Sequence, residues 1–175
     1  MNATTNPATP IVLNAGEGDK QSFSGGGLHI WKLLAEDTDG AFFLFEDTMV
    51  KDKTTPIHAH PEADEVTYVL DGEIEVEVDG KRSRVRSGGM SFAPKGVPHA
   101  FIVLSAQARM LTFQSPGAVG QAFYRGASDP ATDASAENVD NVDIPRLQST
   151  AMQNPRGITL LGPPPFAVNA AARAT

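Results

Sequence analysis

Apolar and polar residues alternate over many short segments between residues 28 and 114. A period of two is typical of strands with one face buried, because successive side chains point to opposite faces of a sheet. Turn-forming pairs such as Asp39-Gly40 and Asp71-Gly72 separate the segments. Many short strands at regular spacing predict an all-β fold in which antiparallel strands form a sandwich or barrel.

The segment EIEVEV-DG-KRSRVR is a predicted hairpin whose register can be written residue by residue. Its two-residue Asp79-Gly80 loop favours a type I′ turn. This register places Glu77, Glu75 and Glu73 opposite Arg82, Arg84 and Arg86, respectively. The charged face is therefore expected to lie in solvent, with cross-strand ion pairs each worth roughly 0.2–1 kcal/mol.

The two ends of the chain differ from this pattern. We expect an N-terminal arm over residues 1–20, a β-barrel over 21–118 and a C-terminal extension over 119–175. The stretch from 115 to 142 is rich in small and polar residues, which favours loops. The segment after Asp143 predicts a short helix, with Asp143 as its cap and Pro145 in its first turn.

Composition excludes several classes of function. The chain has no cysteine, which excludes disulfides, thiolate metal sites and cysteine nucleophiles. Its formal net charge is −7 and it has no basic cluster, so nucleic-acid binding is not expected. No segment has the roughly 20 apolar residues that span a membrane, and the N-terminus lacks a secretory pattern. A soluble, cytoplasmic protein is the expectation.

Three of the four histidines lie at predicted strand starts. His58 and His60 are two residues apart, so both imidazoles can lie on one face of a strand. Glu65 opens the next strand and His99 a later one. Three imidazoles and a carboxylate suit one divalent first-row metal, with coordination positions left for water, oxygen or substrate. The ligand types leave Fe, Mn, Ni, Co, Cu and Zn open.

Two motifs carry a resemblance to the cupin superfamily. HAHPEADEVTYVLDG resembles its first motif, and GGMSFAPKGVPHAFIV resembles its second. The resemblance implies a jelly-roll barrel of two antiparallel sheets, and it implies that His58, His60, Glu65 and His99 bind the metal. The chain departs from the family pattern at Asp52, where glycine is frequent, and at Val103, where asparagine is frequent; neither position is a ligand.

The segments SPG…FYRGASDPA and ITLLGPPP are similar to those of bacterial single-domain cupins of the quercetin-2,3-dioxygenase type. This resemblance implies dioxygen-dependent opening of a flavonol or related enol. Glu65 would then be both ligand and catalytic base. Thr67 shares the face of Glu65, and Phe101 and Val103 share the face of His99, so these three are the expected substrate-pocket residues. His29 alternates with Trp31 and is expected to be packed.

Three functions remain open from the ligand chemistry. The first is a metal-dependent dioxygenase acting on an enolic or phenolic small molecule. The second is a non-redox isomerase, epimerase or lyase, which would need basic or acidic residues in its pocket. The third is a small-molecule-binding protein without turnover. Apolar outer sheet faces predict a homodimer in which residues 1–20 or ITLLGPPP cross to the partner.

Overall fold

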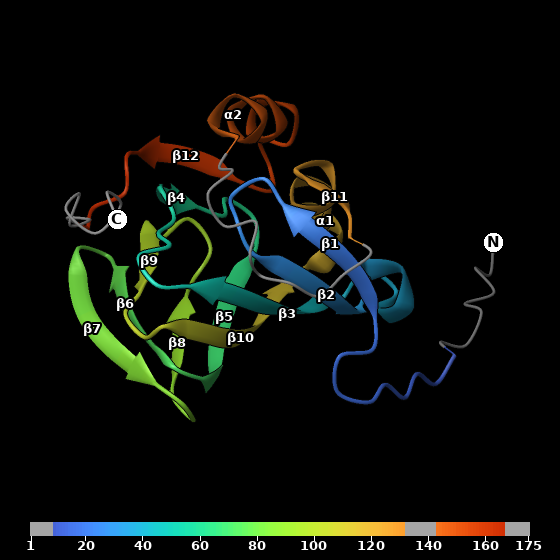
Figure 1. Ribbon diagram of the computed structural model, residues 1–175. Helices are drawn as coiled ribbons and strands as arrows, with labels where there is room; N and C mark the ends of the chain where they lie inside the picture. The colour runs from blue at the N-terminus through green and yellow to red at the C-terminus, as the bar shows by residue number, and fades with distance from the viewer. Residues whose placement is uncertain (1–8, 132–142, 167–175) are drawn as a thin grey trace.

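Two antiparallel sheets form the protein, as the alternating pattern predicts. The computed structural model describes residues 9–131 and 143–166 (Figure 1). One sheet has seven strands in the order β11-β1-β2-β3-β10-β5-β8, and the other has five in the order β12-β4-β9-β6-β7. The strands are β1 (Asp19–Phe23), β2 (Leu28–Leu33), β3 (Phe43–Val50), β4 (Ile57–Ala59), β5 (Asp64–Asp71), β6 (Glu73–Val78), β7 (Lys81–Arg86), β8 (Met90–Ala93), β9 (His99–Val103), β10 (Gln107–Ser115), β11 (Ser128–Pro130) and β12 (Thr159–Gly162).

The β6–β7 hairpin has the predicted register. Ile74 pairs with Val85, and Glu77 pairs with Arg82. Asp79 and Gly80 have φ values of 52° and 72°, as a type I′ turn requires. Arg82, Arg84 and Arg86 each form ion pairs with glutamates of β6. Because these arginine side chains are about half exposed or more, the pairs contribute little to stability.

Two α-helices lie after β10 in the described residues, and only one of them was predicted. Helix α2 (Ile144–Gln153) begins after Asp143, whose carboxylate accepts a hydrogen bond from the Arg146 backbone N–H. The prediction of loops was wrong for residues 117–130, because α1 (Gly117–Gly126) and β11 lie there, and residues 132–142 lie outside the described part of the chain. The glycines of α1 permit close packing rather than breaking the helix. A Cβ on Gly117 would overlap the β3 backbone, and one on Gly120 would overlap the Gln114 side chain.

The C-terminal segment folds back over the barrel. In Figure 1, α2 and β12 lie together at the top of the view, beside β4. Strand β12 pairs with β4 of its own chain, rather than leaving the molecule towards a partner. Strand β11 pairs with β1, whose first residues fall within the predicted arm. The extension is therefore part of both sheets.

Two apolar clusters fill the interior. One joins the sheet to both helices and contains Trp31, Phe43, Phe45, Phe123 and Leu147. The other lies within the barrel, with Val69, Ile74, Val103 and Met110 at its centre. Complete burial of such a side chain stabilises the fold by about 1.5–3 kcal/mol. The helices are thus held by the same kind of packing as the strands.

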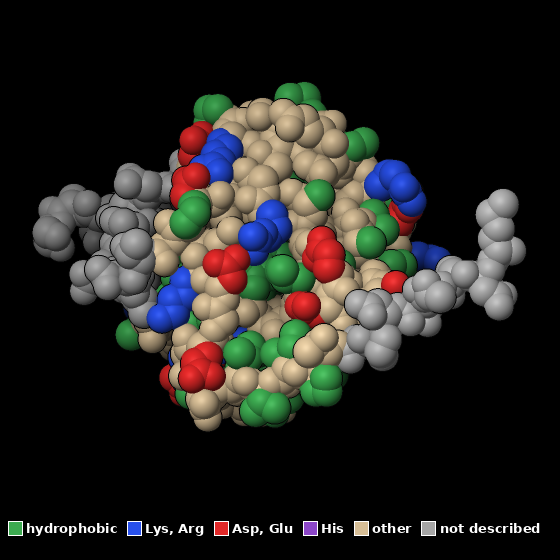
Figure 2. Space-filling model, turned by 90° about the vertical axis from the view of Figure 1, so that its right-hand side faces the viewer, with side chains coloured by type: hydrophobic (Ala, Val, Ile, Leu, Met, Phe, Trp, Pro, Cys, Tyr) green, Lys and Arg blue, Asp and Glu red, His purple; other side chains and the backbone are tan. Residues whose placement is uncertain are grey.

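On the one face that Figure 2 draws, the described residues do not form a basic patch. On the face drawn in Figure 2, acidic and basic side chains are interspersed, apolar side chains lie between them, and no histidine is visible. Among the described residues, no helix is both long enough and apolar enough to cross a membrane.

Candidate metal centre

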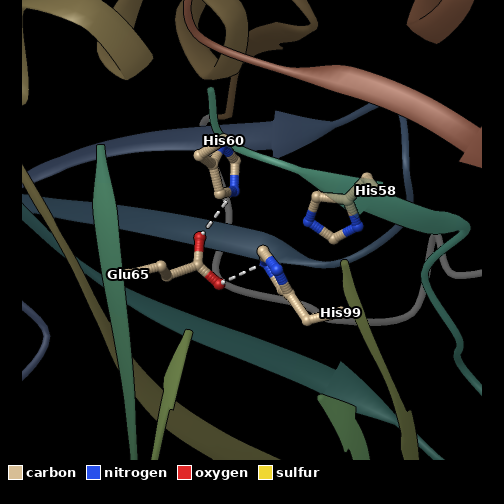
Figure 3. Close-up of side chains that lie close together, drawn as sticks. All are labelled: His58, His60, Glu65 and His99. Carbon is tan, nitrogen blue, oxygen red and sulfur yellow. Dashed lines mark ion pairs between the residues drawn. The ribbon is translucent and has the colours of Figure 1, made fainter. Parts of the chain in front are cut away.

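The three histidines and the glutamate converge at one point between the two sheets. His58 lies in β4 and pairs across the strands with His99, the first residue of β9. His60 follows β4 directly, and Glu65 is the second residue of β5. Their ligand atoms all lie within 4.8 Å of one another (Figure 3). All four residues are buried, and none is more than 9% exposed. The structure therefore brings all four predicted ligands together.

Backbone carbonyls orient the three imidazoles. The Nδ1 atom of His58 lies 2.8 Å from the Pro56 carbonyl oxygen, and that of His99 lies 2.9 Å from the Val97 oxygen. His60 Nδ1 lies 2.6 Å from the oxygen of Gly157, far along the chain. Each carbonyl accepts a hydrogen bond from Nδ1–H, which leaves the lone pair on Nε2. Three Nε2 lone pairs are therefore directed at one point, and that of His60 also accepts a hydrogen bond from Gln114 Nε2 at 2.9 Å.

The remaining contacts fit a bound divalent metal. Glu65 Oε2 lies 3.0 Å from His60 Nε2, and Glu65 Oε1 lies 3.4 Å from His99 Nε2. His99 Nε2 is buried without a hydrogen-bond partner among the described residues. With Nδ1 protonated, the Nε2 atoms and the Glu65 oxygens that face one another are all electron-pair donors, which is the arrangement that a metal cation would bind. Nitrogen and oxygen donors in this set suit first-row divalent metals.

The protonation states also favour metal binding. Burial, followed by the neighbouring His99 and His60, lowers the pKa of His58 to about 3, so His58 is neutral. Burial opposes ionisation of Glu65, but His60 and His99 outweigh it and hold the pKa of Glu65 well below its usual range. Burial would lower the pKa of His99, but the nearby Glu65 carboxylate raises it, so a metal that binds His99 displaces any proton held there. A neutral imidazole and an ionised carboxylate are the forms that bind metals.

Two residues that the sequence did not indicate hold Glu65. Gln114 Nε2 donates a hydrogen bond to Glu65 Oε2 at 2.7 Å, and the Tyr124 hydroxyl donates to the same oxygen at 3.2 Å. Gln114 is the cross-strand partner of Glu65 on β10, and it is completely buried. Burial, then the charges of Glu65 and Asp47, raise the pKa of Tyr124 well above its usual value. The tyrosine is therefore a neutral donor.

A cavity of about 210 Å³ opens beside the cluster. His58, Glu65 and Tyr124 line it, and so do the predicted pocket residues Thr67 and Phe101. Val103 does not line it, because its side chain is completely buried in the barrel's apolar cluster. The fourth histidine, expected to be packed, is buried and also lines the cavity. Helix α2 and β12 supply part of the wall, so the C-terminal segment shapes the cavity.

Comparisons with known proteins agree with this architecture. A family model for the cupin domain matches residues 45–113. Quercetin 2,3-dioxygenase of Bacillus subtilis (strain 168) is 29% identical over 117 residues, which is 65% of this chain. The match covers 34% of that protein, so the chain corresponds to about a third of its relative's length.

Solved structures show the same fold at lower identity. KdgF from Halomonas sp. matches with a TM-score of 0.56 and 21% identity, over 62% of this chain and 94% of that one. A predicted oxalate decarboxylase from Thermotoga maritima matches with a TM-score of 0.56 and 18% identity, over 60% and 98%. These likenesses and the sheet topology show the cupin fold, and residues 45–113 match the cupin domain family.

Proposed function

We propose that this protein is a metal-dependent dioxygenase that acts on a flavonol-like or other enolic or phenolic small molecule. The observation that carries the proposal is the buried His58, His60, Glu65 and His99 cluster at the wall of a largely apolar cavity. The similarity to a quercetin 2,3-dioxygenase supports the choice of reaction. A bound Fe, Mn, Ni, Co or Cu ion would supply Lewis-acid and redox chemistry, whereas Zn would supply the former alone.

Glu65 is the proposed catalytic base. It is ionised at neutral pH and lines the cavity, so its carboxylate can accept a proton from a substrate hydroxyl. Its lowered pKa makes it a weak base, and a weak base needs an acidic partner. Enols and phenols are more acidic than alcohols, which favours this substrate class over sugars. Tyr124 and Gln114 hold the accepting oxygen in place.

The cavity lining favours an apolar substrate. Aromatic and aliphatic side chains dominate it, and the described lining residues include neither lysine nor arginine. A non-redox isomerase, epimerase or lyase for small acids would use such cations to bind its substrate. The lack of such cations in the lining supports the dioxygenase over an isomerase, epimerase or lyase that acts on small acids.

Metal analysis followed by oxygen uptake tests the proposal. We expect about one transition metal per chain in the purified protein, and consumption of one dioxygen per flavonol when a flavonol panel is supplied. Isotopically labelled dioxygen should place both of its oxygen atoms in the products. Metal-replete protein that consumes no dioxygen with any enol or phenol in the panel would contradict the proposal, and a binding protein would remain.

We also propose a homodimer. Tyr68, Met90 and Phe92 are 41%, 52% and 48% exposed on the neighbouring strands β5 and β8. Apolar side chains gathered on one sheet face are typical of contact surfaces, and a second copy of the chain presents the same face. Light scattering at micromolar concentration should give twice the mass of the chain. A monomeric mass would contradict the proposal.

A further inference from the structure

His29 and Asp47 form a buried pair that the metal centre does not use. They lie directly opposite each other on β2 and β3, and both side chains line the cavity. His29 is 1% exposed and Asp47 is 4% exposed. His29 Nε2 lies 3.0 Å from Asp47 Oδ1. A carboxylate in an apolar cavity is costly unless it is hydrogen-bonded, so the pair needs an explanation.

The pair is rigid but incompletely hydrogen-bonded. The His29 ring is stacked between Phe23 and Phe45, with both centroids 4.5 Å away. His29 Nδ1 and Asp47 Oδ1 have no aligned hydrogen-bond partner among the described residues. Buried polar atoms are rarely left in this state, because each one has lost its hydrogen bonds to water. Unpartnered polar atoms in a cavity wall indicate a place where a ligand supplies the missing hydrogen bonds.

The pair lies at a distance from the metal ligands along the cavity floor. Inner-face residues of β5, β10 and β3 form successive rows across the seven-stranded sheet. Glu65 is in the first row, the paired Thr67 and Thr112 are in the second, and Asp47, opposite His29, is in the third. Each step covers two residues, so Glu65 and Asp47 are about 13 Å apart along the strand direction.

Tyr124 lies between the two polar places. Its hydroxyl is 3.2 Å from Glu65 Oε2, and its ring centroid is 5.9 Å from that of His29. The charges of both Glu65 and Asp47 contribute to raising its pKa, which also places it near both carboxylates. Phe45 and Phe101 line the same cavity. The cavity therefore has ionisable groups at two separated places, with Tyr124 and the threonine pair between them.

We propose that His29 and Asp47 are a second polar binding site, which holds a hydroxyl group of the substrate remote from the metal centre. A hydroxyl both donates and accepts hydrogen bonds, so it can donate to the Asp47 carboxylate and accept from the His29 N–H. An anionic group would be repelled by Asp47. The aromatic substrate with polar groups at both ends is taken from the proposed function, and to that extent this proposal rests on it.

Binding measurements on zinc-loaded protein without oxygen test the site. Quercetin and 3-hydroxyflavone share the enol group, but only quercetin has hydroxyls on its remote rings. We expect the parent to bind quercetin about tenfold more tightly, as one additional charge-assisted hydrogen bond would provide. His29→Phe keeps a flat ring between Phe23 and Phe45, and it should remove this preference while leaving the affinity for 3-hydroxyflavone within about twofold. A preference that His29→Phe retains would overturn the proposal.

Asp47→Asn and a second ligand pair separate this site from the proposed function. Asp47→Asn keeps the side-chain size and should also weaken the preference, so it decides the question if His29→Phe does not fold. If the parent binds neither flavonol, the flavonol-like substrate class is wrong, and 2-naphthol against naphthalene then tests the site alone. A hydroxyl-dependent gain in affinity that both variants lose supports the site; no gain, or a gain that both retain, overturns it.

Discussion

Two parts of the chain meet at the metal centre and differ in what they contribute. Residues 45–113, which match the cupin family, contain all four candidate ligands. Residues 114–166 contain none, yet Gln114 and Tyr124 donate hydrogen bonds to Glu65, and the Gly157 carbonyl holds His60. The same segment supplies α2 and β12 to the cavity wall. Residues 45–113 therefore supply the metal ligands, and residues 114–166 orient two of them, His60 and Glu65.

A ligand motif therefore identifies the residues that bind the metal but not the groups that orient those residues. Groups that orient a ligand fix its tautomer and tune its basicity, and their loss typically costs about 10–100-fold in affinity or activity. Changes in the family-matched part should therefore have the largest effects. In the C-terminal segment, changes at the residues that contact Glu65 or His60 should have intermediate effects on metal affinity. Changes at its other residues should have negligible effects.

The largest effect is expected for His60→Ala. It removes one imidazole ligand. Losing a group that only orients a ligand costs about 10–100-fold in metal affinity, so losing the ligand itself should cost more than about a hundredfold. The strands should persist, because the apolar clusters are unchanged. Metal stoichiometry and circular dichroism measure the two results. Glu62→Gln, in the turn between the same ligands, is the matched control; a His60→Ala protein with full metal content would refute the ligand assignment.

Glu65→Gln should reduce turnover by at least about a hundredfold at neutral pH. It keeps the size and one ligating oxygen but removes the basicity, and general-base catalysis is worth about 10²–10⁴-fold. Three imidazoles remain, so metal loss should be partial. Turnover is therefore expressed per bound metal. Parental turnover per metal would show that Glu65 acts as a ligand alone.

The sequence predicted the family-matched part because its signals are local. His58 and His60 share a face through the two-residue period of a strand, and Asp79-Gly80 specifies the hairpin register within a few residues. Glu65 and His99 are separated further, and the resemblance to cupin motifs joined them. Each of these inferences needed only short spacings along the chain.

The contacts of the C-terminal segment could not be predicted in this way. Tyr124 and Glu65 are 59 residues apart, and the glycines around Tyr124 indicated loops rather than the closely packed α1. The Gly157 carbonyl is 97 residues from His60 and has no side-chain signature. The His29–Asp47 pairing depends on a connection that contains the 3-10 helix η1 (Ala35–Thr38) and on a register shift after Trp31. Tertiary packing decides all three contacts.

Gly157→Ala should weaken metal binding by about 10–100-fold without touching a ligand. A Cβ at this position would lie 2.6 Å from the Val119 backbone oxygen, so the chain must shift. The shift moves the carbonyl that accepts the His60 hydrogen bond. Gly126→Ala is the control, because its Cβ would meet only the Thr150 side chain at 3.0 Å. Equal metal affinities for the two folded variants would show that the His60 contact is unimportant.

Tyr124→Phe should change metal affinity or turnover per metal by about tenfold, near the lower limit for orienting groups. It removes one of the two donors to Glu65 Oε2 and leaves Gln114 in place. Tyr68→Phe changes the chain's other tyrosine, which is 41% exposed on the same strand as Glu65, and should have no effect. Both quantities are measured by metal competition titration and oxygen uptake. Identical results for the two variants would contradict the role of the Tyr124 hydroxyl.

The smallest effect is expected for Arg156→Ala, although this residue joins the two parts next to Gly157. Arg156 Nε donates to Glu62 Oε1 at 2.7 Å, in the turn between His60 and Glu65. The two side chains are 73% and 41% exposed, so solvent screens the pair, and metal affinity should change by less than about twofold.

The pH dependence of the stability of Arg156→Ala tests whether this exposed contact between the two parts of the chain matters. The hydrogen bond with Arg156 holds the pKa of the Glu62 carboxyl below its usual value. For a carboxyl with a lowered pKa, the stabilisation is present above the unfolded pKa and is lost as the pH falls through the folded one. Any small difference in melting temperature between parent and Arg156→Ala should therefore be constant at neutral pH and disappear in acid. A difference that grows in acid, or a loss of metal like that of Gly157→Ala, would show that this exposed pair positions the ligand turn after all.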